Sequence, residues 1–324
     1  MESNVLLSII VPIYNSALFL KRCVESVYAQ DLDSDHFELL LIDDGSTDDS
    51  LKVCKDLRSR HNNIKVYAKE NGGQATARNL GLEHAQGKYV MFLDSDDLLV
   101  PNTVSQLLRV AEEKQSEITI GSMKKYYPNG SFKIANDFIH QTLLVSGKWA
   151  LLNGLNLGTV CGRLFLRSFI EEHHIKFTEG MRHEDVMFSM KAALQAERII
   201  SIEEVIYIYL WRNGSTDRSF DKDNLRSSLL SNLRIIQEMR KLSLSNTLSL
   251  PLKEYFYKKS NSIIIGDILT IIRRWKQHGD LWSTYYMEAK RMELLPISAK
   301  GKSWRAKFLI FVINYIYLIG SKIK

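Results

Sequence analysis

Asp94 and Asp96 are the residues of this sequence best suited to bind a divalent metal ion. They flank Ser95 directly after the apolar run 89–93. Alternate residues of an extended segment point the same way, so both carboxylates can meet one ligand. Oxygen ligands suit Mg²⁺ or Mn²⁺, which keep few protein ligands and complete their shell with phosphate oxygens. The alternative interpretation is structural: Asp97 precedes an expected helix and would make this cluster an acidic N-terminal cap.

Asp43 and Asp44 form a second acidic pair at the end of an apolar run, here 37–42. Ser46 or Thr47 can cap the helix expected next. That role leaves the two carboxylates unexplained, because adjacent acids repel each other without a partner. A carboxylate at this position could accept the imide N–H of a uracil or a ribose hydroxyl.

A glycine turn leading into a helix occupies residues 71–79, with the sequence Asn-Gly-Gly-Gln-Ala-Thr-Ala-Arg-Asn. The backbone N–H groups at such a helix start attract anions. Arg78 lies within the first turns and could add a charge-assisted contact. The segment is therefore a candidate phosphate contact, although glycine turns also occur for purely structural reasons.

Buried strands alternating with helices must position these residues. The apolar runs predict strands at 5–11, 37–42, 64–67 and 89–93, and the helical spacing between them predicts helices at 16–30, 52–60 and 75–86. Such alternation predicts an α/β fold with a mostly parallel sheet and helices on both faces. Ligands of these sheets bind at the carboxyl ends of the strands, where Tyr14 and both acidic clusters stand.

The later sequence changes character near residue 220. Before it, the patterns predict strands at 118–122 and 199–210, a hairpin turn at 126–131 and a helix at 184–196. Beyond it, no strand with an acidic end recurs, and 225–241 and 252–275 are helical in pattern. We therefore expect a domain at 1–220, followed by a helical region at 221–324 that ends in a basic apolar tail.

Taken together, these segments resemble the family 2 glycosyltransferases of GT-A fold. The resemblance covers roughly residues 5–215 and is carried by the stretches 8–15, 43–48, 71–81 and 87–97, with His183-Glu184-Asp185 similar to the family's late Glu-Asp motif. It implies a Rossmann-like GT-A domain, a nucleotide-sugar donor, UDP-sugar first, a Mn²⁺ or Mg²⁺ cofactor and inversion at the anomeric carbon. The acceptor it implies is a glycan or a lipid-linked molecule of surface polysaccharide synthesis.

The resemblance also implies roles for single residues. Asp185 matches the general base, which takes the proton of the attacking hydroxyl, and Asp94 and Asp96 match the metal ligands. Glu184, His183 and Arg212 match positions near the acceptor or the diphosphate. The implied nucleotide-binding residues, in which Tyr14 stacks on the base and Asp44 bonds its edge, are Pro12, Tyr14, Asp43, Asp44, Arg78, Asp94 and Ser95.

One departure and two alternatives limit this interpretation. Many relatives carry Trp, Asn and Lys where this chain has the stretch 161–164, Cys-Gly-Arg-Leu, so the acceptor is not carried over. A nucleotidyltransferase would need a glycine- and lysine-rich loop after the first strand, where 12–15 reads Pro-Ile-Tyr-Asn. A membrane-associated nucleotide-sugar-binding protein without turnover would not need the intact acids Asp94, Asp96 and Asp185.

The net positive charge of the chain lies outside the segments that carry this resemblance. The 324 residues include 43 basic and 37 acidic ones, and 45% are hydrophobic, which excludes a disordered, fibrous or disulfide-stapled chain. From Lys253 onward there are 14 basic and 5 acidic residues, whereas the first 252 hold 29 and 32. The basic pI near 9.0 therefore belongs to the C-terminal quarter and does not indicate a nucleic-acid partner.

The C-terminal tail and the cysteines bear on location. The apolar run 308–319 is shorter than the roughly 20 residues that span a bilayer, and basic residues flank it. The segment 302–324 therefore either lies on an anionic membrane surface or docks as a final helix on the protein. Cys23, Cys54 and Cys161 lack metal or disulfide spacing and predict free thiols. These features favour the cytoplasm, with peripheral attachment to the inner face of the membrane.

Overall fold

A computed structural model describes residues 5–135, 143–211 and 221–295. These residues form two compact units. The first comprises the described residues up to 180 and from 184 to 211, and the second comprises 181–183 with 221–295. The domain limit predicted at residue 220 lies outside the described residues.

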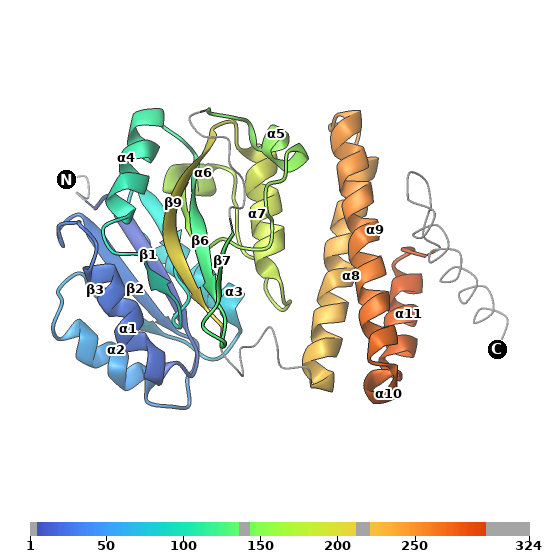
Figure 1. The fold of residues 1–324 in the computed structure, drawn as a ribbon, viewed down its shortest axis with the longest axis horizontal. Coiled ribbons are helices and arrows are strands. Elements are labelled where there is room, and N and C mark those ends of the chain that lie inside the picture. The colour runs from blue at the N-terminus through green and yellow to red at the C-terminus, as the bar shows by residue number, and fades with distance from the viewer. Residues whose placement is uncertain (1–4, 136–142, 212–220, 296–324) are drawn as a thin grey trace. The chain divides into compact units, whose positions relative to one another are not determined.

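Within the described residues, nine strands form one mixed sheet (Figure 1). Its order is β3-β2-β1-β4-β8-β6-β9-β5, and β7 pairs with β6. The neighbours β3, β2, β1 and β4 are all parallel, as the sequence predicts. Antiparallel β8, which the sequence did not predict, joins β4 to β6. The strands are β1 Leu7–Ile13, β2 Phe37–Asp43, β3 Ile64–Ala68, β4 Tyr89–Phe92, β5 Leu98–Leu99, β6 Ile118–Tyr126, β7 Phe132–Ala135, β8 Arg163–Leu166 and β9 Ile199–Leu210.

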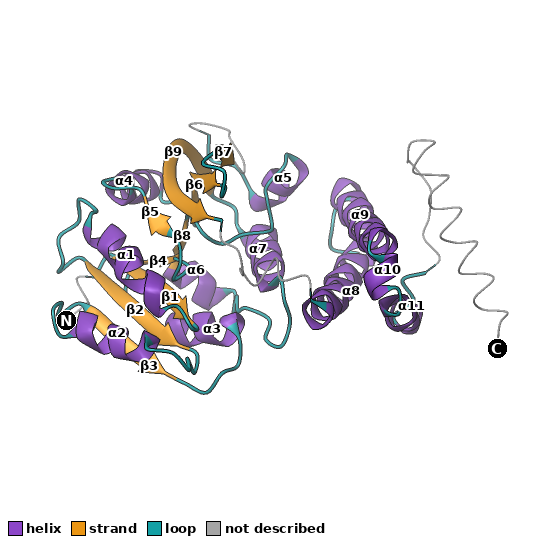
Figure 2. Cartoon of the chain, turned by 60° about the horizontal axis from the view of Figure 1, so that its bottom comes forward, coloured by secondary structure: helices purple, strands orange, loops and turns teal. Residues whose placement is uncertain are grey.

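Helices cover both faces of this sheet, which makes the fold α/β as predicted (Figure 2). Every residue of β1 is buried, because alternate residues enter different cores. Ile9 packs with Leu20 and Val24 of α1 on one face, whereas Ile10 lies against Gly81 of α3 on the other. The helices of this unit are α1 Ala17–Tyr28, α2 Ser50–Arg58, α3 Gln74–His84, α4 Val104–Lys114, α5 Gly147–Leu152, α6 Arg167–Glu172 and α7 Glu184–Gln195.

An aromatic cluster fixes α7 against the sheet. Phe188 of α7 stacks on Phe177 with ring centroids 4.2 Å apart and meets Phe92 of β4 and Phe165 of β8 edge-on. These rings are buried, and aromatic pairs of this geometry add about 0.5–1.5 kcal/mol each beyond their buried area. The packing holds the first turn of α7 close to the carboxyl end of β4, where the polar residues gather.

The second unit is helical, as the sequence predicts for 225–241 and 252–275. It contains α8 Lys222–Leu244, α9 Leu250–Arg273, α10 Trp275–His278 and α11 Leu281–Arg291. The Asp221 side chain caps α8 by accepting from the backbone N–H groups of Asp223 and Asn224. Across the part of the chain that the structure describes, every helix is too short or too polar to cross a bilayer. The tail 302–324 lies outside that part.

A buried acid, Asp267 of α9, makes the stability of this helical unit depend on pH. Asn232 and the Tyr285 hydroxyl donate to its carboxylate at 2.7 and 3.0 Å, but burial still raises its pKa to about 7. The folded state then binds a proton that the unfolded chain, with a pKa near 4, releases. Stability therefore falls as pH rises from about 4 to 7.

Asp267→Asn should show the effect of this acid directly. The substitution removes the titrating group, so we expect the variant to gain stability relative to the wild type as pH rises from 5 to 8. Thermal unfolding of both proteins at the two pH values measures the difference, with the exposed Asp280→Asn as the control. A stability difference between wild type and Asp267→Asn that does not vary with pH would contradict the prediction.

Candidate active site

The loop after β4 is a turn and not the extended segment expected for 94–96, because the Asp97 N–H donates to the Asp94 carbonyl oxygen at 3.0 Å. Asp94 and Asp96 are partly exposed, whereas Ser95 and Asp97 between and after them are buried. Ser95 Oγ donates to Ser16 Oγ, just before α1, at 2.8 Å. The loop therefore leaves both carboxylates partly accessible, while Ser95 and Asp97 are buried against the protein.

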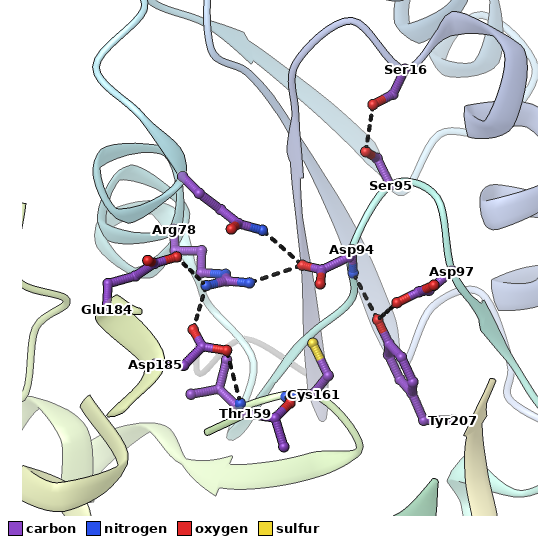
Figure 3. A network of polar contacts seen from close by, with 12 residues as sticks. Ser16, Arg78, Asp94, Ser95, Asp97, Thr159, Cys161, Glu184, Asp185 and Tyr207 are labelled. Atoms are coloured by element: carbon purple, nitrogen blue, oxygen red, sulfur yellow. Dashed lines mark hydrogen bonds and ion pairs between the residues drawn. The ribbon is translucent and has the colours of Figure 1, made fainter. Parts of the chain in front are cut away.

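Asp97 ties this loop to β9 and does not cap a helix. Its carboxylate accepts from the Tyr207 hydroxyl at 2.7 Å (Figure 3). It also accepts from the Leu210 backbone N–H at 2.9 Å. The same hydroxyl accepts from the Asp94 N–H at 3.2 Å. Burial, together with the charge of Asp94, raises the pKa of Asp97 to about 7. The prediction that Asp97 caps a helix is therefore wrong, because the next helix, α4, begins only at Val104.

Arg78 joins the two ends of the candidate site. It is 1% exposed. One guanidinium nitrogen donates to Asp94 at 2.8 Å, and the other donates to Glu184 at 2.9 Å and to Asp185 at 2.5 Å (Figure 3). Gln74 also donates to the Asp94 oxygen, at 2.9 Å. A single buried cation therefore holds the acid of the β4 loop and the acids that start α7 in one network.

Asp185 has the electrostatics of a group that can take a proton at neutral pH. Burial raises its pKa to about 7, the charges of Glu184 and Asp94 act in the same direction, and Arg78 opposes them. The second carboxylate oxygen accepts from the Val160 N–H at 3.3 Å, which fixes the orientation of the group. A general base works best when its pKa lies near the working pH.

Asp44 organises the glycine turn that precedes α3. Its carboxylate accepts from Lys69 Nζ at 2.6 Å and from the Gly72 and Gly73 N–H groups at 3.0 and 2.7 Å. Gly73, with a φ of +89°, adopts a backbone conformation that residues with a side chain rarely take. The buried carboxylate thus shapes the start of the helix that carries Arg78, a role that the sequence did not reveal.

Asp44→Ala should destabilise this domain by about 3 kcal/mol, because it leaves an ammonium group and two backbone donors without their acceptor. Thermal or urea unfolding measures the loss. Lys69→Met serves as the matched variant, since it removes the cation but keeps both backbone bonds, and its effect should be smaller. Equal effects of the two substitutions would show that the turn does not depend on the carboxylate.

The ends of β1 and β2 bring the other predicted nucleotide contacts to one edge. Ile13 pairs with Asp43 in the parallel register, Pro12 lies one residue earlier, and Tyr14 follows with 51% of its surface exposed. Asp43 is buried; one oxygen accepts from the Ser46 N–H at 3.3 Å, and the other accepts no hydrogen bond from any described residue.

The expected cap of the next helix by Ser46 or Thr47 is wrong. The helix α2 begins at Ser50, whose N–H donates to Asp48 at 2.9 Å. Ser46 Oγ accepts instead from the backbone N–H of Asn15 at 3.0 Å. This contact joins the loop after β1 to the loop after β2. Ser46 lies four residues before the start of α2, too far to cap it, whereas Asn15 lies within hydrogen-bond distance.

Two further predicted residues lie elsewhere or outside the description. His183 belongs to the helical unit, where its ring nitrogen lies 2.8 Å from Ser228 Oγ of α8. Arg212 lies outside the described residues. Among the described residues, no three or more His, Cys, Asp or Glu side chains group as metal ligands. The three cysteines are free thiols, as predicted, and all three are buried.

Several residues of this network carry no clear signal in the sequence. Tyr207 lies within a strand pattern of aromatic and β-branched residues, Gln74 begins a helix, and Lys69 ends a short strand. The Val160 N–H that holds Asp185 belongs to the segment just before β8, beside the stretch 161–164 where the chain departs from its relatives. The sheet order β4-β8-β6-β9 brings the Val160 and Tyr207 groups to the site, and the pairing of β2 with β3 brings Lys69 to Asp44.

Comparison with known proteins identifies the family. The model of glycosyl transferase family 2 matches residues 8–173. The chain belongs to this family. It is 31% identical over 226 residues to the glycosyltransferase GlyG of Streptococcus pneumoniae serotype 4, a match that covers 66% of this chain and 73% of GlyG. This glycosyltransferase is therefore an enzyme of the transferase class.

Two further comparisons give a second named glycosyltransferase and a solved structure of similar fold. The poly(ribitol-phosphate) β-glucosyltransferase of Bacillus spizizenii is 30% identical over 211 residues, which are 63% of this chain but 32% of that protein. The structure of S. aureus TarS 1–349 in complex with UDP-GlcNAc has a TM-score of 0.60 and 23% identity, and the match covers 89% of this chain and 92% of that one. This likeness confirms the predicted GT-A-like fold with its helical C-terminal region.

Proposed function

We propose that this glycosyltransferase moves a sugar from a UDP-sugar to a hydroxyl of a glycan or lipid-linked acceptor in surface polysaccharide synthesis, with inversion at the anomeric carbon. The Arg78 network carries the proposal, because one guanidinium holds Asp94 and Asp185 in the same site. Inverting transfer needs donor-phosphate binding on one side of the reacting sugar and a general base on the other. This network brings both kinds of carboxylate together.

The nucleoside would bind at the ends of β1 and β2. Tyr14 offers an exposed ring for stacking on the base. Asp44 already accepts three hydrogen bonds from the protein, whereas one Asp43 oxygen accepts none from the described residues. We therefore assign the contact with a nucleoside N–H or O–H group to Asp43 first, and to Asp44 the shaping of the turn. The structure of TarS with UDP-GlcNAc supports a UDP-sugar as the donor class.

Asp94 and Asp96 fit a divalent cation as a pair. Both are partly exposed carboxylates of one loop, and no third described ligand groups with them. Mg²⁺ and Mn²⁺ bind in this way when a diphosphate and water complete the shell. When bound, the cation supplies neutralisation of the charge that develops on the leaving diphosphate. Arg78, which contacts Asp94, would fix the orientation of that carboxylate.

Asp185 would take the proton of the acceptor hydroxyl. Its raised pKa and the fixed orientation given by Arg78 and Val160 support this role. Glu184 contacts the same guanidinium nitrogen as Asp185, so it would position Arg78 and, through it, the base. The free thiols support a reducing compartment. We place the enzyme in the cytoplasm, with the basic tail 302–324 as its contact to the inner membrane face.

A panel of nucleotide sugars tests the proposed donor. Unfolding temperatures are measured with UDP-, GDP- and dTDP-sugars, each with Mn²⁺, with Mg²⁺ and with EDTA, because a ligand that binds the folded state raises its stability. We expect UDP-sugars with either metal to give the largest increase, and EDTA to reduce it. An Asp94→Asn, Asp96→Asn double variant is the control. A larger increase with GDP- or dTDP-sugars, or no effect of metal, would overturn the assignment.

A further inference from the structure

A row of two lysines and one tyrosine crosses three neighbouring strands of the sheet. Strands β7, β6 and β9 lie side by side (Figure 1). In the pairing of β7 with β6, Lys133 lies opposite Lys125, and in the pairing of β6 with β9, Lys125 lies beside Tyr209. Partners in register point to the same face of a sheet. The Lys125 ammonium lies 5.9 Å from the centre of the Tyr209 ring, which agrees with that placement. We call these three residues the basic strip.

The basic strip continues from the candidate active site. Met123 and Tyr207, two residues earlier on β6 and β9, pair with each other and point to the same face as the strip. The Tyr207 hydroxyl contacts both Asp94 and Asp97. Since a strand rises about 3.3 Å per residue, the strip begins about 7 Å along the sheet from Tyr207.

Charge and rings make this surface suitable for an anionic chain. The segment 118–135 contains lysines but no acidic residue, and Lys133 is exposed. The acids of β9, Glu203 and Glu204, precede Tyr209 by at least five residues, about 16 Å of strand. Beyond the strip, the rings of Tyr127 and Trp211 lie 5.0 Å apart. Ammonium groups attract phosphates, and aromatic faces pack against the C–H groups of sugars and polyols.

We propose that the basic strip binds an acceptor chain that carries phosphate groups, a phosphodiester-linked glycan or polyol, and guides it to the transfer site. The inference rests on the proposed function, since it names the class of acceptor. The acid nearest to the strip is Asp97, whose charge interacts with Lys125. Its carboxylate is buried and accepts from the Tyr207 hydroxyl and the Leu210 N–H, so it does not account for the exposed Lys133. A neutral glycan would not require this second lysine in register. A nucleic acid is less suited, because the first 252 residues have more acidic than basic residues.

The opposite face of the same hairpin supplies a matched control. Lys124 adjoins Lys125 in the chain but points to the other face, where its ammonium lies 3.9 Å from the Phe132 ring centre and 4.8 Å from that of Tyr126. Lys124→Ser therefore removes one charge from the same strand without changing the strip. It separates binding at the strip from a general effect of positive charge.

Binding of a fluorescent eight-unit poly(ribitol phosphate) to the full chain tests the proposal. Anisotropy titrations at 50 and 300 mM NaCl compare the wild type with Lys125→Ser/Lys133→Ser, Tyr209→Ala and Lys124→Ser. We expect the double variant to bind at least tenfold more weakly at 50 mM and to lose most of the salt dependence. Tyr209→Ala should bind more weakly with unchanged salt dependence, and Lys124→Ser should bind like the wild type.

Binding of the variants and of other ligands defines the results that would overturn the proposal. Equal losses in Lys124→Ser and the double variant, or equal binding of a neutral eight-glucose oligomer, would overturn it. Tighter binding of an eight-nucleotide DNA strand or of phosphatidylglycerol vesicles, with the same dependence on Lys125 and Lys133, would assign the strip to another partner. Stabilisation by UDP with Mn²⁺ is measured in every variant and should not change. If UDP with Mn²⁺ does not stabilise the wild type, the proposed function is contradicted. The proposal for the strip is then decided by the polymer titrations alone.

Discussion

Asp185→Asn is expected to lower the turnover number for sugar transfer by 10²–10⁴-fold while nucleotide binding persists. That range is the usual contribution of a general base. An amide cannot take the proton of the acceptor hydroxyl, but its oxygen can still accept from Arg78 or from the Val160 N–H. Transfer rates with a radiolabelled UDP-sugar, together with thermal stabilisation by UDP, measure the two effects separately.

The pH dependence of the wild type provides a second measure of the same base. Because the pKa of Asp185 is raised to about 7, the carboxylate is protonated in acid, and the rate should fall as pH decreases through 7. Glu184→Gln keeps the base but should shift this fall in rate to lower pH, because the charge of Glu184 raises the pKa of Asp185. A rate in Asp185→Asn equal to that of the wild type would exclude this residue as the base.

Arg78→Met is expected to destabilise the domain by about 3–5 kcal/mol, the cost of removing one partner from a buried ion pair. Arg78 faces Asp94, Glu184 and Asp185, and its loss leaves their negative charges close together without a cation. Chemical unfolding of the variant and of the wild type measures the difference in stability.

The destabilisation by Arg78→Met should depend on pH. Arg78 lowers the pKa of Asp185, so its removal raises that pKa further. Protonation relieves the repulsion, and the difference between variant and wild type should therefore be smaller at pH 5 than at pH 8. Arg78→Lys should recover part of the stability but little transfer, because one ammonium does not span two carboxylates as a guanidinium does. A pH-independent loss would show that packing, not charge, is what Arg78 provides.

Local patterns predicted much of the fold and of the site. Apolar runs that end in acids predicted β2 and β4, and helical spacing predicted α7 and the two long helices α8 and α9. The runs also placed Asp94 and Asp96 directly after β4. These features depend on residues close together in the chain. Their physical causes, burial on both faces of a strand and on one face of a helix, act over a few residues.

Contacts between distant segments could not be predicted in this way. Asp97 was interpreted as a helix cap, but it pairs with Tyr207, 110 residues away. The antiparallel β8 is four residues long, too short for a periodic signal. Asp44 and Lys69 meet because β2 and β3 are neighbours, which neither residue reveals alone. Such pairings form only when strands from distant parts of the chain assemble into one sheet. The sequence of a single strand does not determine which strand lies beside it.

The pairing of β5 with β9 has a consequence for the order in which the protein becomes active during synthesis. Leu98 and Leu99, just after the acidic loop, pair with Ile208 and Tyr207 of β9. The ribosome releases the strands β1–β4 long before β9, and contacts between such distant segments form slowly. The acidic loop therefore gains its final support only when translation has passed Leu210. On the proposed function, a nascent or truncated chain that ends earlier would lack a supported acidic loop, so it could not use nucleotide sugar before the domain is complete.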